Sequence, residues 1–179
     1  MDPMDPESIR LAPKVVLHDH LDGGLRPATV IALADEVGYD ALPSTDEVQL
    51  ATWFHRGADR RDLGLYLETF EHTVGVMQTA AACHRVALEC AVDLAGDGCV
   101  YAEVRFAPAL HTAGGLSLDE VVEAILAGFA EGSDGTGLTI RALVTAMRTS
   151  TDSMKVAETA IRPAMSNPTT PRSRYRMAV

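Results

Sequence analysis

The sequence lacks a surplus of basic side chains and lacks long apolar runs. Its 179 residues carry 15 Lys and Arg against 25 Asp and Glu, a formal net charge of −10. Nucleic acids and anionic membrane surfaces both require concentrated positive charge on their partner, so we expect neither as a partner. No stretch approaches the roughly 18 apolar residues of a membrane span. The acidic start MDPMDPESIRLAPK lacks the basic and apolar segments of a secretory signal. We therefore expect a soluble, cytoplasmic protein.

Cysteine is scarce as well. The three cysteines, Cys83, Cys90 and Cys99, form neither a CxxC pair nor an even set. This argues against a disulfide framework and against a zinc-finger knuckle. Cys83 and Cys90 lie on the apolar stripe of a helix predicted over 79–95, so we interpret both as core residues.

The sequence does contain a regular alternation of strand and helix patterns, and 47% of its residues are apolar. Two capping boxes, Ser44 with Glu47 and Ser117 with Glu120, mark helix starts. We predict strands over 14–18, 100–106 and 138–147, and helices over 27–37, 44–54, 63–74, 79–95, 118–132 and 151–161. Such alternation is typical of an α/β fold with a parallel sheet. Three strand–helix units are too few to close an eight-stranded barrel, which takes about 250 residues.

The last 17 residues differ in composition from the rest. They hold three of the nine prolines, three arginines and no acidic residue, whereas residues 1–162 carry 12 basic and 25 acidic side chains. We therefore predict one folded unit over 1–162 and an irregular tail over 163–179.

One group of residues carries recognisable chemistry. His18 and His20 flank Asp19 directly after the first predicted strand. Side chains two positions apart on a strand project from the same face, so both imidazoles can reach one metal ion while Asp19 points away. The alternative interpretation is that the two histidines are surface residues or ordinary hydrogen-bonding groups.

The letters around this pair resemble a known family. The stretch PKVVLHDHLDGGLRPATVIALA resembles the first strand and turn of the adenosine deaminase family. VYAEVRFAP resembles its second strand, and LYLETFEHT resembles the helix over its purine pocket. The likeness runs from about Pro13 to Arg162. It implies an incomplete (β/α)8 TIM barrel that comprises about the first three β/α units, with extra helices after the first strand.

The resemblance also implies roles for individual residues. In this family the two histidines of HxH bind one Zn²⁺, which falls here on His18 and His20, and His20 also lies close to the substrate. The aspartate of LDG contacts the ribose, which falls on Asp22, although Asp22 could instead be only a turn residue. The helix face beside the purine falls on Leu63, Tyr66, Leu67 and Phe70, although this stripe could equally be plain core. The implied reaction converts adenosine and water to inosine and ammonia. The other zinc deaminase signature, HxE with PCxxC, is absent.

The remaining charged and imidazole side chains receive structural interpretations. Glu103 and Arg105 share the polar face of the second strand, where we expect a buried ion-pair network. Four further histidines are predicted to be structural or exposed. They are His55, His72, His84 and His111.

The family's remaining site residues have no counterpart here. The HAGE motif, the later histidine and the late aspartate are missing, and the sequence has no histidine after His111. We therefore assign no catalytic residue and expect a truncated chain that is inactive alone, with a purine nucleoside as its small-molecule partner. Exposed barrel edges predict self-association. Three alternatives stay open: a non-catalytic half-barrel binding module, a fragment of an adenine or AMP deaminase, and an unrelated α/β domain.

Overall fold

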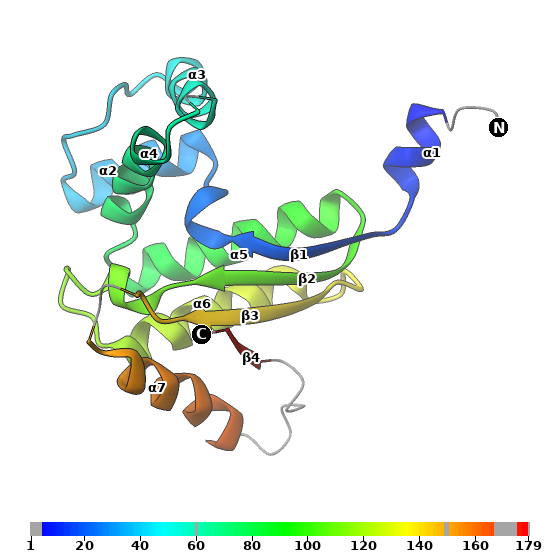
Figure 1. The fold of residues 1–179 in the computed structure, drawn as a ribbon. Helices are drawn as coiled ribbons and strands as arrows, with labels where there is room; N and C mark the ends of the chain where they lie inside the picture. Colours follow the sequence, from blue (N-terminus) through cyan, green and yellow to red (C-terminus); the bar gives the residue numbers. More distant parts are fainter. Residues whose placement is uncertain (1–4, 60, 149–150, 167–174, 179) are drawn as a thin grey trace.

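The computed structural model describes residues 5–59, 61–148, 151–166 and 175–178. Within them, four parallel strands form one sheet in the order β1-β2-β3-β4. Helices α5 and α6 lie along one side of this sheet, and α2, α3 and α4 gather beyond the carboxyl end of β1 (Figure 1). The strands are β1 (Lys14–His20), β2 (Cys99–Phe106), β3 (Thr139–Thr145) and β4 (Tyr175–Ala178). The α-helices are α1 (Pro6–Leu11), α2 (Pro27–Val37), α3 (Glu47–Ala58), α4 (Leu63–Val76), α5 (Ala80–Gly96), α6 (Leu118–Ser133) and α7 (Ser153–Ser166), and the short 3₁₀ turns are η1 (Leu21–Gly23) and η2 (Pro108–His111).

This element order confirms the predicted α/β architecture with extra helices after the first strand. In the part of the chain that the structure describes, no helix has both the length and the apolar character to cross a membrane.

The core lies between the sheet and the pair α5 and α6. Ala102, Val104 and Phe106 alternate along β2 and are fully buried, as a strand with one covered face requires. The two helices approach closely because Gly128 and Gly132 of α6 carry no side chain. A Cβ atom on Gly128 would lie 2.2 Å from the backbone oxygen of His84 in α5.

The first strand is interrupted near its carboxyl end. Its register on β2 pairs Val16 with Ala102 and Asp19 with Val104, so β1 holds one extra residue between these pairs. His18 lies at this β-bulge and has a φ of 63°, in the left-handed region that non-glycine residues seldom adopt.

Helix α3 begins differently from the prediction. Asp46 is its N-cap, and the Asp46 carboxylate accepts a hydrogen bond from the Gln49 N–H at 2.8 Å. The capping box predicted for Ser44 with Glu47 is wrong, because the Ser44 hydroxyl accepts instead from the Asp46 N–H at 3.1 Å. Aspartate and serine are both strong N-caps, and Asp46 lies only two residues after Ser44. The capping box of Ser117 with Glu120 is confirmed.

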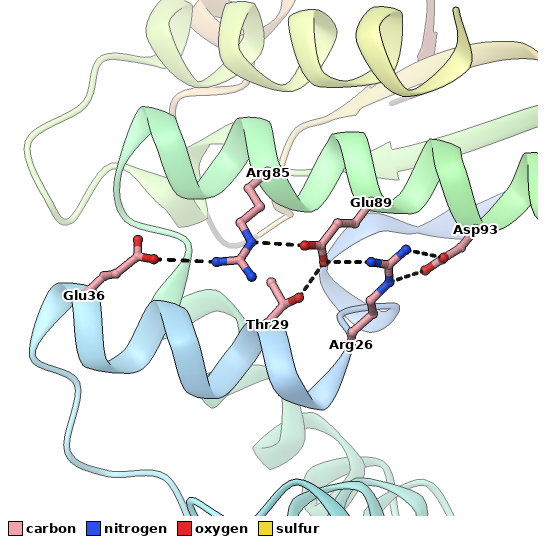
Figure 2. A network of polar contacts seen from close by, with 6 residues as sticks. All are labelled: Arg26, Thr29, Glu36, Arg85, Glu89 and Asp93. Carbon is pink, nitrogen blue, oxygen red and sulfur yellow. Dashed lines mark hydrogen bonds and ion pairs between the residues drawn. The ribbon is translucent and has the colours of Figure 1, made fainter. Parts of the chain in front are cut away.

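A polar network ties α2 to α5 (Figure 2). Arg26 forms an ion pair with Asp93 and lies 4.0 Å from Glu89, and Glu89 also accepts hydrogen bonds from Thr29 at 2.5 Å and from Arg85 at 3.0 Å. Because Arg26 is the residue before α2, the network fixes where this helix leaves the turn that follows β1.

The carboxyl-terminal segment departs from the expected irregular tail. Helix α7 runs to Ser166, past the predicted boundary at 162, and the backbone of β4 pairs with β3. Without β4, this edge of β3 would leave backbone groups unpaired, so an extended segment beside it gains hydrogen bonds. The rest of the predicted tail, 167–174 and 179, lies outside the described residues.

Candidate metal centre

The imidazoles of His18 and His20 lie next to one another at the carboxyl end of β1. Their ring centroids are 5.5 Å apart, and the ring planes meet at 63°. Two imidazoles that share a tetrahedral zinc ion, with Zn–N distances of about 2.0–2.1 Å, have centroids about 5 Å apart. The separation of the two rings is therefore compatible with two of the positions around one zinc ion. Within residues 5–59, 61–148, 151–166 and 175–178, no group of three potential ligands is assembled.

The two rings come together through a different backbone geometry from the one predicted. The prediction assumed the regular alternation of a straight strand, whereas the bulge at His18 breaks that alternation. Asp19, between the two histidines, has contacts of its own. It accepts a hydrogen bond from the His20 N–H at 2.8 Å, and its charge contributes to raising the pKa of the Cys90 thiol on α5.

His20 is surrounded by charged and aromatic groups. Its Nδ1 lies 3.9 Å from Oδ1 of Asp22, and a guanidinium nitrogen of Arg105 lies 3.1 Å from each of its ring nitrogens. Phe70 of α4 approaches edge-on with a centroid separation of 6.4 Å. Burial lowers the pKa of His20, and the charge of Arg105 lowers it further, whereas Asp22 opposes this shift. The neutral imidazole that binds metals is thereby favoured.

Asp22 lies in η1 with only 9% of its surface exposed. Its other imidazole neighbour is His111, whose pKa is lowered by burial and raised in part by the charge of Asp22. His111 is fully buried, and neither of its ring nitrogens has a hydrogen-bond partner of good geometry among the described residues. The sequence prediction of a structural or exposed residue thus missed its position beside the candidate site. The signal available was its place directly after the second strand.

The predicted substrate face of α4 is exposed. Leu63 is 71% and Leu67 is 53% exposed, Tyr66 is exposed, and Phe70 is partly buried. The interpretation of this stripe as plain core is therefore wrong for the first three residues. The adjoining face of α4 is buried and carries Thr69 and Thr73, which line one cavity together with Tyr66 and Phe70. The two hydroxyls donate to the carbonyls of Tyr66 at 2.7 Å and Phe70 at 3.2 Å.

A cavity of about 230 Å³ adjoins these residues. Asp22, Tyr66 and Phe70 line it together with Phe54 of α3 and Leu25, which precedes α2. A larger hollow of about 810 Å³ lies between α6 and β3 and shares no lining residue with the candidate site.

Glu103 and Arg105 share the polar face of β2, as predicted, and both are half-buried. Glu103 accepts a hydrogen bond from the Tyr101 hydroxyl at 2.8 Å. Arg105 instead contacts His20 and, at 3.5 Å, the Thr145 hydroxyl of β3. The sequence correctly placed both charged residues on one face but did not identify the partners of Arg105.

The other histidines lie away from the pair. His55 is exposed on α3, His72 lies 2.9 Å from the Tyr39 hydroxyl, and His84 lies 3.2 Å from Glu131. The prediction that these three are structural or exposed is confirmed.

Comparison with known proteins shows which family this sequence is similar to. The sequence model of the family described as adenosine deaminase matches residues 13–167. An adenosine deaminase from Mycobacteroides abscessus is 58% identical over 164 residues, which cover 89% of this chain and 45% of that protein. The chain thus spans about half the length of the curated relatives it matches.

Solved structures share the fold. Adenine deaminase from Arthrobacter aurescens superposes with a TM-score of 0.71 at 23% identity, over 84% of this chain and 45% of that one. An amidohydrolase from Burkholderia ambifaria, solved with bound Zn, gives a TM-score of 0.66 at 20% identity, over 88% and 41%. The fold is accordingly a partial (β/α) barrel, and the chain belongs to the adenosine deaminase family.

Proposed function

We propose that this chain supplies the first half of the active site of a zinc-dependent adenosine deaminase, which converts adenosine and water to inosine and ammonia. The curated relatives named adenosine deaminase, at about 58% identity, support adenosine over other purines as the substrate. The observation that carries the proposal is the imidazole pair of His18 and His20 beside the buried carboxylate of Asp22.

His18 and His20 are the residues that would hold the metal. Zinc, when bound, lowers the pKa of a coordinated water toward 7 and so supplies hydroxide at neutral pH. The protein's part is to keep the His20 imidazole neutral, which its burial and the nearby Arg105 charge favour.

The substrate would lie between η1 and α4. The Asp22 carboxylate can accept hydrogen bonds from ribose hydroxyls, and the exposed face of Leu63, Tyr66 and Leu67 offers an apolar surface to the purine ring. Water is excluded from that ring when these side chains cover it, which favours binding in proportion to the apolar area buried. We also propose His20 and Phe70 as substrate neighbours, because the two rings lie edge to face beside Asp22.

Zinc stoichiometry tests the metal site. The purified chain is expected to bind one Zn²⁺ in equilibrium dialysis, and the double substitution His18→Ala with His20→Ala is expected to abolish this binding. His55→Ala, which removes an exposed histidine from α3, is the matched control and should leave the stoichiometry unchanged. Equal binding by the wild type and the double variant would contradict the proposed site.

Ligand binding tests the substrate class. Saturation-transfer NMR is expected to show contact between adenosine and aromatic protons of the chain, and Asp22→Asn is expected to weaken it. Stronger binding of adenine or of adenosine 5′-monophosphate than of adenosine would favour the alternative purine deaminases.

A further inference from the structure

Arg105 occupies an unusual position against the proposed metal ligand. It comes from β2, where it is in register with His20 of β1. One guanidinium nitrogen, Nη1, lies 3.1 Å from Nδ1 and 3.1 Å from Nε2 of His20. A single cationic group therefore covers both nitrogens of the imidazole.

This contact opposes metal binding in two ways. An imidazole coordinates a metal through a ring nitrogen, and here Arg105 approaches both of them. The guanidinium also keeps its positive charge at all physiological pH values. A divalent cation a few ångströms from this charge would be repelled, and partial burial of the site strengthens that repulsion.

Arg105 also has an alternative neighbour. Its Nε lies 3.5 Å from the Thr145 hydroxyl at the end of β3, on the side away from β1. The guanidinium can therefore move off the imidazole toward β3 while it retains one polar contact.

We infer that Arg105 is a positioning residue that covers His20 in the metal-free chain and must be displaced before His20 can bind zinc. This inference rests on the proposed zinc site for the identity of the ion. It concerns the affinity of the site, which Arg105 sets by competing for the His20 imidazole.

Zinc affinity of two matched variants tests the inference. Arg105→Gln and Arg141→Gln each remove one positive charge, and Arg141, on β3, is in register with Glu103 of β2 and not with His20. In competition with a chromophoric chelator, we expect Arg105→Gln to bind Zn²⁺ at least about tenfold more tightly than the wild type, the size of effect typical of groups that contact metal ligands. Arg141→Gln should change the affinity by less than about threefold because screening weakens the more distant charge.

The outcomes separate the inference from the proposed function. Equal affinity of Arg105→Gln and wild type, or equal gains in the two variants, would overturn the role of Arg105. Zinc binding that survives the His18→Ala and His20→Ala double substitution would instead overturn the metal site itself. Failure of both the wild type and Arg105→Gln to bind zinc would overturn both.

A measurement on the wild-type chain tests the inference without relying on the folding of Arg105→Gln. Saturation of the wild type with Zn²⁺ should shift the Nε–Hε NMR resonance of Arg105, because the guanidinium leaves the imidazole. An unchanged resonance at saturating zinc would show that Arg105 stays on the His20 imidazole while zinc is bound, and would refute the displacement.

Discussion

A single methyl group added between α5 and α6, at a glycine of α6, should lower the Tm of the protein. In Gly128→Ala, the new Cβ atom would lie 2.2 Å from the His84 backbone oxygen and 2.9 Å from the Ala87 Cβ. The first of these atoms belongs to the helix backbone, so it cannot rotate away as a side chain could. The two helices would have to separate locally by about 1 Å, which loosens a close-packed interface.

Two opposing effects set the magnitude. Alanine is favoured over glycine in a helix by about 1 kcal/mol. Overpacking a well-packed contact costs typically about 1–3 kcal/mol, and the upper end applies where backbone must move. The expected net loss in the free energy of unfolding is therefore about 2 kcal/mol, equivalent to about 4–8 °C in Tm for a chain of this size.

Urea and thermal melts followed by far-UV circular dichroism measure the effect. Gly96→Ala is the matched control, because Gly96 is also helical and a Cβ there meets no atom within 4 Å. We expect that control to be neutral or stabilised by up to about 1 kcal/mol. A Gly128→Ala variant as stable as Gly96→Ala would refute the close-packing argument.

Three further predictions concern buried polar groups. Burial lowers the pKa of His111 below its unfolded value near 6.5, so the unfolded chain takes up the proton first as the pH falls. The free energy of unfolding should therefore fall as the pH drops below about 6.5 and stay level above it. His111→Leu should flatten this pH dependence in urea melts, and an unchanged slope would contradict the prediction. Burial raises the pKa of Cys83 and of Cys90 to about 12, so neither thiol should react with iodoacetamide at pH 8 until the chain is denatured, as mass spectrometry can check. Glu89→Gln should destabilise the chain by about 1–3 kcal/mol, because three side chains of the α2–α5 network converge on this largely buried carboxylate. Asp93 is more exposed, so Asp93→Asn should cost less than about 1 kcal/mol. A larger loss for Asp93→Asn than for Glu89→Gln in urea melts would refute this ranking.

Periodicity and local capping chemistry were enough to locate most elements. The helical periodicity of α4 and the capping box of Ser117 with Glu120 are both encoded within a few helical turns, so the sequence predicts this helix and this helix start correctly. The bulge in β1 was not predictable, because nothing in KVVLHDH distinguishes His18 as the residue with a positive φ.

Contacts between residues distant in the sequence could not be predicted either. Alternation places Arg105 on the polar face of β2, but its contact with His20 spans 85 residues and depends on the register between the two strands. Likewise, the burial of His111 follows from how η2 packs against α4 and α6, which no local pattern encodes.

The left-handed backbone conformation of His18 lowers the stability of the fold. Glycine adopts a φ of 63° freely, whereas an L-residue with a side chain pays about 1–3 kcal/mol to do so. A glycine there would relax the backbone yet remove the ring that faces His20. The chain thus holds an imidazole at a position where conformational preference alone would select glycine, so the stability of the fold and the proposed metal site place opposite demands on this residue.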